Sequence, residues 1–291
     1  MESIENLLGY KGKNVVITGS ASGMSKTATE LLISLGANVY AIDRSDIDLP
    51  VYKAIKGDLG KKETIDEAIA ELPEKIDALF VCHGMALVKG KEKLIQLVNF
   101  IGQRYLVETL LPRITDGGSV SFISSSGGYG WESKMSLIGE ILACPTFEDQ
   151  ANWVDEHIEI FSDGYSSDAY CFSKQCINAY IKSKVRSQEF IGRKIRINAV
   201  APSYTTSGLT KDFNLAVSQD GSEESGEQLM YDLFLKSWDG RPGKPEEMGY
   251  PLVILGSNLC SYLSGQVIYI DFGLTGESDY KTACNLSGSE K

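Results

Sequence analysis

Short apolar runs rich in β-branched residues recur along the chain and alternate with segments of helical pattern. Strands that are buried on both faces have near-continuous apolar sequences, and strands that alternate with helices are typical of βαβ units. The pattern therefore predicts a parallel sheet with helices on both of its faces. The runs are NVVIT (14–18), NVYAI (38–42), DALFVC (77–82), SVSFIS (119–124), RINAV (196–200) and QVIYI (266–270).

The segments between these runs are long enough for crossover helices. One of them ends at Gly36, a residue suited to a helix C-cap, a second stops before Pro112, and a third begins at Pro245. With 291 residues and no change of composition along the chain, we expect one domain over residues 1–291.

The formal net charge of −11 comes from acidic residues that are spread over the chain. This charge argues against binding to nucleic acid or to an anionic membrane. No run reaches the roughly 18 apolar residues of a membrane span, and the first residues are too polar for a signal peptide, which predicts a cytoplasmic protein. The six cysteines form no CxxC pair and only two histidines are present, so we expect no metal site.

Glycines follow the first apolar run and open the next helical segment. In VVITGSASGMSKTATELL, Gly19 and Gly23 allow a sharp turn, and the helix N-terminus offers free N–H groups to a phosphate. Asp43 ends the second apolar run, 43 minus 19 or 24 residues after Gly19. A carboxylate there can accept both ribose hydroxyls of an adenosine and repels a 2′-phosphate, so we expect NAD(H) rather than NADP(H). Arg44 beside it is able to pair with a phosphate and argues the other way.

The segment DAYCFSKQCINAYIKSK twice contains a tyrosine four residues ahead of a lysine. Residues four apart share a helix face, so the lysine can lower the pKa of the tyrosine and make it an acid/base group. Tyr170 lies 202 minus 170, or 32, residues before Pro202, which leaves room for a helix, a turn and a strand. Tyr180 is ten residues further on, roughly 80° and 15 Å away along one helix, so both tyrosines cannot serve one site. We take Tyr170 with Lys174 as the functional pair, and Tyr180 with Lys184 as an amphipathic surface pair.

Together these motifs resemble the short-chain dehydrogenases/reductases over residues 12–275. The matching parts are the TGxxxGxG-like loop after the first strand, GDLG (57–60), YxxxK and RINAVAP. The resemblance implies an α/β fold of the Rossmann type, with a doubly wound, mostly parallel sheet of seven strands and helices on both faces. It also implies hydride transfer with NAD(H) and a homodimer or homotetramer. Ser25 replaces the third glycine of the loop, at a modest expected cost in packing.

By this resemblance, Asn99, Ser125, Tyr170 and Lys174 form the catalytic set. Ser125 would bond the substrate oxygen, Tyr170 would act as acid/base, and Asn99 would hold a water that leads to Lys174. Lys174 would hold the nicotinamide ribose and favour the tyrosinate. His83 is expected to line the pocket near the adenine rather than act as an acid or base. The expected cofactor contacts are Gly19, Ser22, Gly23, Met24, Asp43, Arg44, Asp58, Leu59, Cys82, His83, Gly84, Tyr170, Lys174, Pro202, Thr205 and Ser207.

Two segments depart from the strand–helix alternation. Residues 129–167 carry two tryptophans, and residues 204–240 combine an acidic stretch with the apolar LMYDLFL. Long segments in a compact fold are usually lids or binding segments, although a tolerated insertion or an oligomer contact also explains the first. We expect an insertion on the substrate side at 129–167, a lid at 204–240 and a C-terminal tail at 276–291.

The 44 residues between Ser125 and Tyr170 exceed the family's usual spacing. This long gap resembles the bacterial hydroxysteroid dehydrogenases of the 3α-hydroxysteroid dehydrogenase/carbonyl reductase type. It implies an NAD-dependent alcohol dehydrogenase or ketone reductase (EC 1.1.1) for a bulky apolar small molecule, most of all a steroid, with 20β reduction of corticosteroids among the options. An aryl-alcohol dehydrogenase of the coniferyl-alcohol kind is the alternative. An NAD-sensing regulator without turnover is the third reading, and it would not need Ser125, Tyr170 and Lys174 together.

Overall fold

The computed structural model describes residues 3–161, 169–236 and 240–287. Seven strands form one sheet, in the order β3-β2-β1-β4-β5-β6-β7, and each neighbouring pair is parallel. The predicted doubly wound α/β fold is therefore confirmed, and this sheet is parallel throughout. The strands are β1 (Asn14–Thr18), β2 (Asn38–Asp43), β3 (Lys53–Lys56), β4 (Ile76–Val81), β5 (Ile114–Ile123), β6 (Arg196–Pro202) and β7 (Val267–Ile270).

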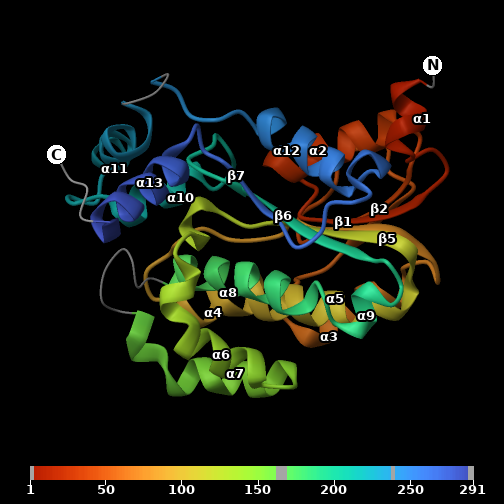
Figure 1. Cartoon of the computed structure of the whole chain (residues 1–291), viewed down its shortest axis with the longest axis horizontal. Helices are drawn as coiled ribbons and strands as arrows, with labels where there is room; N and C mark the ends of the chain where they lie inside the picture. Colours follow the sequence, from red (N-terminus) through yellow and green to blue (C-terminus); the bar gives the residue numbers. More distant parts are fainter. Residues whose placement is uncertain (1–2, 162–168, 237–239, 288–291) are drawn as a thin grey trace.

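Helices cover both faces of the sheet (Figure 1). Helices α1, α2 and α12 lie on one face, and α3, α4, α5, α8 and α9 lie on the other. Helices α10, α11 and α13 lie together beyond one end of the sheet. The helices are α1 (Ile4–Leu8), α2 (Gly23–Ser34), α3 (Lys62–Ala70), α4 (Glu92–Gln96), α5 (Gly102–Leu110), α6 (Met135–Ala143), α7 (Phe147–Glu156), α8 (Ala169–Lys184), α9 (Gln188–Ile191), α10 (Thr210–Val217), α11 (Glu223–Met230), α12 (Pro245–Gly256) and α13 (Leu274–Ser287).

The apolar runs are explained by burial on both faces. In β1, Val15 and Ile17 pack against the α2 and α12 side, and Val16 packs into the core on the opposite side. Because successive strand side chains point to opposite faces, a strand with two covered faces needs an unbroken apolar sequence. Strand β3 was not recognisable in this way, since it lies at the sheet edge and only Ile55 among its side chains is buried.

The chain reverses its direction of winding between β1 and β4. It proceeds from β1 outward to β2 and β3, and then returns to form β4 on the other side of β1. In open α/β sheets the loops at the carboxyl ends of the strands separate at such a point and leave a crevice for a ligand. The topology thus places a binding site beside the loops that follow β1 and β4.

Residues 129–161 form a second helical layer outside the first. Helices α6 and α7 lie beneath the layer that contains α4, α5 and α8 (Figure 1). The guanidinium of Arg104 on α5 donates to the carbonyl oxygens of Ile141 and Leu142, at 3.4 and 3.2 Å. The ring of Trp153 stacks on Phe172 of α8, with centroids 5.9 Å apart. These contacts join the segment to the body of the fold.

No helix in the described parts of the chain is both long enough and apolar enough to cross a membrane.

Candidate active site

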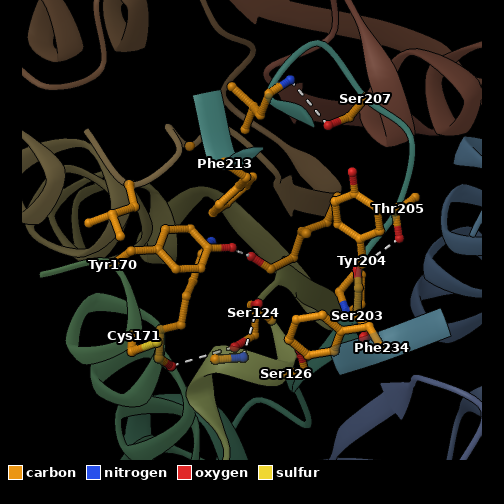
Figure 2. Close-up of a pocket in the computed structure, with 18 of the residues that line it drawn as sticks. Ser124, Ser126, Tyr170, Cys171, Ser203, Tyr204, Thr205, Ser207, Phe213 and Phe234 are labelled. Atoms are coloured by element: carbon orange, nitrogen blue, oxygen red, sulfur yellow. Dashed lines mark hydrogen bonds between the residues drawn. The ribbon is translucent and has the colours of Figure 1, made fainter. Parts of the chain in front are cut away.

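Two cavities adjoin one another at the carboxyl ends of the strands. The first, of about 390 Å³, is lined by the glycine loop and by Asp43 and Asp58, and we call it the glycine-loop cavity. The second, of about 310 Å³, is lined by Ser125, Tyr170 and Lys174, and we call it the tyrosine cavity (Figure 2). The two cavities are parts of one continuous site, because seven residues line both of them. These residues are Met24, Cys82, Gly84, Met85, Ile123, Ser207 and Leu209.

The glycine loop has the backbone that a phosphate cradle requires. Gly19 has φ +75° and Gly23 has φ +61°, a region that L side chains rarely adopt. A Cβ on Gly19 would lie 3.0 Å from Cα of His83, so the two loops can approach only with glycine at this position. Gly23 begins α2, whose first N–H groups and partial positive charge face the cavity side of the loop.

Ser25 fits the position where the family has a third glycine. Its side chain is buried, and its hydroxyl donates to the carbonyl oxygen of Gly19, with that of Ser22 also within reach at 3.2 Å. The added hydroxyl therefore stabilises the turn instead of crowding it.

Asp43 is held in place at the end of β2. Its Oδ2 accepts from the backbone N–H of Ala21 at 2.9 Å, and its Oδ1 accepts from that of Ser45 at 2.8 Å. A carboxylate has about four acceptor positions, so capacity is left for two ribose hydroxyls. Arg44, Asp58 and Leu59 line the same cavity.

His83 presents an unused hydrogen-bond donor beside this cavity. The hydroxyl oxygen of Thr18 accepts from the N–H groups of Cys82 and His83, at 2.8 and 3.2 Å. Its single hydrogen then goes to Nδ1 of His83 at 2.8 Å rather than to the oxygen of Phe80 at 3.4 Å. Burial lowers the pKa of His83 to about 3, so the neutral ring carries its hydrogen on Nε2.

This Nε2 is buried and has no hydrogen-bond partner among the described residues. A buried donor without a partner is costly. Together with the glycine cradle and the fixed carboxylate of Asp43, it indicates that the cavity is built to receive a polar group such as a dinucleotide. It also agrees with the expectation that His83 lines the pocket rather than acting as an acid or base.

Tyr170, Lys174 and Ser125 come together in the tyrosine cavity. Tyr170 and Lys174 lie one turn apart at the start of α8, and Nζ of Lys174 is 5.8 Å from the centroid of the Tyr170 ring. A Cβ on Gly127 would lie 3.4 Å from Cε1 of Tyr170 and 3.5 Å from Oγ of Ser125, so both side chains flank this glycine. Nζ of Lys174 donates to the carbonyl oxygen of Ile123 at 3.0 Å.

The three consecutive serines after β5 have different surroundings. The hydroxyl of Ser124 is buried and donates to Oδ1 of Asn178 at 2.6 Å, which gives it a structural partner. Oγ of Ser125 accepts from the N–H of Gly127 at 3.1 Å, and Ser125 lines the cavity near Tyr170. Ser126 lines the cavity as well (Figure 2). This arrangement favours Ser125 as the serine that meets a substrate oxygen.

Asn99 lies at a break in the long helix after β4. Residues Leu97–Ile101 form a π-helical turn between α4 and α5, and such turns are frequent at functional sites. Oδ1 of Asn99 accepts from the N–H of Met85 at 2.8 Å, and its Nδ2 donates to the carbonyl oxygen of Met85 at 3.0 Å. A Cβ on Gly84 would lie 3.3 Å from Asn99 Oδ1 and 3.7 Å from Lys174 Nζ, so these two side chains converge on Gly84.

The prediction that Tyr180 lies on the surface is wrong. Tyr180 does lie outside both cavities. Tyr180 is only 1 % exposed and packs edge-to-face against Phe100 and Phe122, with centroids 6.4 and 6.3 Å away. Its hydroxyl is 3.4 Å from Oε1 of Glu108, which also pairs with Lys184 at 3.1 Å. Tyr180 of the second YxxxK copy is therefore part of the core, because it packs against Phe100 of the π-helical turn and Phe122 of β5.

Several residues of the expected lid segment line the tyrosine cavity, and the insertion contributes much less to it. Phe213 of α10 packs edge-to-face on the Tyr170 ring at 4.9 Å, and Met230 of α11 and Phe234 also line the cavity. Of the residues described between 129 and 161, only Tyr129 lines it. The prediction of a substrate-side insertion is thus wrong for 130–161, because these residues pack against the outer helices; residues 162–168 lie outside the described part.

Other lining residues were not recognisable from the sequence. Leu274, Thr275 and Ser278 of α13 line the tyrosine cavity, and of these Ser278 falls in the segment expected as a tail, 276–291. Of the expected cofactor contacts, Pro202, Thr205 and Ser207 line this cavity too. The expected contacts that precede residue 85 line the glycine-loop cavity, and they are Gly19, Ser22, Gly23, Met24, Asp43, Arg44, Asp58, Leu59, Cys82, His83 and Gly84. Within the described residues, no group of three or more histidines, cysteines and acids forms a metal site.

Comparisons with known proteins agree with this geometry. The profile of the NAD dependent epimerase/dehydratase family matches residues 15–190, more than half of the chain, and a family described as enoyl-(acyl carrier protein) reductase matches residues 158–275. The chain is 27% identical over 263 residues to a coniferyl-alcohol dehydrogenase of Pseudomonas sp. strain HR199, covering 90% of this chain and 96% of that protein. It is 24% identical over 261 residues to the 3-alpha-hydroxysteroid dehydrogenase/carbonyl reductase of Comamonas testosteroni, covering 89% and 95%.

A solved structure shares the fold. The crystal structure of the 3-alpha-hydroxysteroid dehydrogenase from Pseudomonas sp. B-0831 complexed with NADH superposes with a TM-score of 0.75 at 22% identity. The match covers 92% of this chain and 99% of that one.

Proposed function

The chain belongs to the NAD-dependent short-chain dehydrogenases/reductases and is an oxidoreductase, and from this we propose a specific reaction. The proposed reaction is hydride transfer between nicotinamide and the secondary alcohol or ketone of a bulky apolar molecule, a steroid before others. Reduction of a corticosteroid at its 20-keto group to the 20β-alcohol is one form of this reaction. The observation that carries the proposal is the tyrosine cavity itself, which is lined both by Tyr170, Ser125 and Lys174 and by apolar side chains of the lid.

The site residues would divide the work as follows. Bound NAD(H) supplies or accepts the hydride. Tyr170 donates a proton to the carbonyl oxygen in reduction and accepts one from the alcohol in oxidation. Ser125 donates a hydrogen bond to the same oxygen, where negative charge grows during reduction. Lys174 keeps a positive charge beside Tyr170, and Asn99 positions the Gly84–Met85 loop, which lines both cavities.

The shape of the tyrosine cavity supports a bulky apolar substrate. Ligand pockets are commonly 300–1,000 Å³ and mostly apolar, with a few polar groups that fix orientation. Here Phe213, Met230 and Phe234 of the lid contribute apolar side chains to the cavity that the serine loop also lines. A rigid fused-ring ketone can cover these side chains while its carbonyl reaches Tyr170.

Lys174 gives the proposal a pH dependence. Burial lowers the pKa of Lys174 to about 8. The ammonium is therefore present below pH 8 and is lost as the pH rises through that value. We expect kcat/KM for ketone reduction to fall about tenfold per pH unit on the alkaline side. Initial rates measured from pH 6 to pH 10 test this, and a profile that stays level across the whole range would contradict it.

An aryl alcohol is the second candidate substrate. Its support is the similarity to the coniferyl-alcohol dehydrogenase, whose named substrate is aromatic and smaller than a steroid. A regulator that binds NAD without turnover is disfavoured, since it has no use for Tyr170, Lys174 and Ser125 around one cavity.

An NADH-oxidation screen separates these candidates. The screen uses a series of steroid ketones that differ in the position of the keto group, which lies on ring A, B, C or D or on the side chain. We expect activity with at least one of these ketones. Aryl aldehydes and NADPH are included as parallel arms. Activity confined to the aldehydes would replace the steroid by the aryl alcohol, and turnover with none of these compounds would contradict the proposal.

Assembly and location stay predictions. Exposed apolar side chains on α12 and beside β7, among them Ile254, Tyr262 and Phe272, support a homodimer or homotetramer. The cytoplasm is the expected location, as the sequence suggests.

A further inference from the structure

Helix α13 forms a wall of the tyrosine cavity, although its sequence gave no indication of this. Leu274, Thr275 and Ser278 on its first turns line the cavity. The helix start is fixed by Asp271, whose two carboxylate oxygens accept from the N–H groups of Gly273 and Thr275, at 3.0 and 2.9 Å. The position of α13 thus determines how much room a substrate has on this side.

Few side chains of α13 are buried, so little packing holds the rest of the helix in place. Among the side chains described on this helix, residues 274–285, only Thr275 is buried. Elements with few buried contacts have low local stability and open readily. A single well-placed hydrogen bond beyond the first turn therefore has a large influence on where the helix lies.

Tyr129 provides such a bond. Its hydroxyl donates to Oδ1 of Asp279 on α13 at 2.6 Å. Its ring packs edge-to-face on Tyr269 of β7 at 6.0 Å, and its carbonyl oxygen is 3.4 Å from Nε2 of Gln175 on α8. Tyr129 also lines the cavity and directly follows the turn Ser126–Gly128 after the proposed catalytic serine. It therefore connects the reacting end of the cavity to the C-terminal helix.

The bond keeps its donor hydrogen over the working pH range. The hydrogen bond to Asp279, together with burial and nearby acidic groups, raises the pKa of Tyr129 to about 12. The phenol consequently stays protonated, and it donates to a charged carboxylate, which makes a shorter and stronger bond than a neutral acceptor does.

We propose that the Tyr129–Asp279 hydrogen bond is a latch that holds α13 in place as a wall of the substrate cavity and so sets how tightly bulky substrates bind. Both are positioning residues, since they act through α13 and not on the reacting atoms. The substrate part of this inference rests on the proposed function. The structural part concerns the attachment of α13 and does not depend on it.

Asp279 is the decisive position to change, because it does not itself line the cavity. We expect Asp279→Ala to raise KM for the bulky ketone on the order of tenfold with little change in kcat, the loss that corresponds to one charge-assisted hydrogen bond. Asp279→Asn, whose amide oxygen still accepts, should recover part of this loss. Tyr129→Phe should resemble Asp279→Ala, and the double variant should be no worse than either alone.

Glu277→Gln is the matched control on the same helix. Its carboxylate pairs with Lys281 at 2.9 Å and does not line the cavity. We expect this variant to keep the KM of the wild type. The NADH affinity, measured by fluorescence titration, should be unchanged in every variant, because neither Tyr129 nor α13 lines the glycine-loop cavity.

Hydrogen exchange tests the latch without any substrate. Backbone amides of residues 274–285 should exchange faster in Asp279→Ala and Tyr129→Phe than in the wild type and in Glu277→Gln. If these amides exchange at the wild-type rate in both Asp279→Ala and Tyr129→Phe, the inference is overturned. It is also overturned if both variants reduce the bulky ketone with the KM of the wild type. Faster exchange in a protein that reduces no ketone would support the latch and reject the proposed function, so the two failures are distinguishable.

Discussion

Replacing Tyr170 with phenylalanine lowers the turnover number by roughly a hundred- to ten-thousand-fold, the usual contribution of a positioned acid/base group. The ring remains, so its edge-to-face contact with Phe213 and its place beside Lys174 are kept, and only the hydroxyl is lost. NADH should still bind with nearly wild-type affinity. Single-turnover rates and a fluorescence titration of NADH separate these two effects.

Tyr180→Phe is the matched control, because it removes the same atom from the other YxxxK copy of the same helix. The Tyr180 hydroxyl is 3.4 Å from Glu108, which keeps Arg104 and Lys184 as partners. We expect activity within about twofold of the wild type and a loss of about 1 kcal/mol in the free energy of unfolding. Loss of turnover in Tyr180→Phe with retention in Tyr170→Phe would show that the pair was assigned to the wrong copy.

Gly226→Ala opens the lid and raises KM about ten- to a hundredfold. A Cβ on Gly226 of α11 would lie 1.8 Å from the carbonyl oxygen and 2.4 Å from the carbonyl carbon of Asn214 on α10, and neither backbone atom can yield. Overpacking of this kind costs about 1–3 kcal/mol. The two helices must move apart, and they carry Phe213 and Met230, which cover the cavity.

The same change also disturbs Tyr204. Oδ1 of Asn214 accepts from the hydroxyl of Tyr204 at 2.9 Å, and Tyr204 lines the cavity. Steady-state kinetics with a bulky ketone measure the effect. Glu227→Ala, at the next and exposed position of α11, should keep the wild-type KM. Equal KM values for Gly226→Ala and Glu227→Ala would mean that the lid does not limit substrate binding.

The sheet was predictable because its strands carry a local signal. Six of the seven strands stand out as apolar runs. Five of these are central strands with two covered faces, and the sixth, β7, is an edge strand of apolar residues that are not fully buried. Strand β3, at the other edge, has no such signal, because its sequence KAIK contains two lysines and only Ile55 is buried. The π-helical turn at Asn99 was equally invisible, as its residues suit an ordinary helix.

The cofactor side of the site was predictable for a similar reason. The glycines, Asp43 and the Asp58–Leu59 pair lie at or just after the ends of β1, β2 and β3, and these residues line one cavity. The donor on His83 Nε2 was not predictable, because its orientation depends on Thr18, 65 residues away in the sequence. The partners of the buried Tyr180 depend likewise on packing between helices.

The sequence alone determined the parallel sheet, and it predicted the phosphate loop with its acidic partner and the choice between two tyrosines, since these depend on periodicity, backbone freedom and spacing along the chain. The tertiary structure decided which other segments form the walls of the tyrosine cavity. It placed α6 and α7 on the outer helices and α13 beside the cavity, where Asp279 bonds Tyr129, 150 residues earlier in the chain. The physical reason is that a cavity wall requires contact between distant segments, and short-range sequence patterns do not encode which exposed helix will meet which loop.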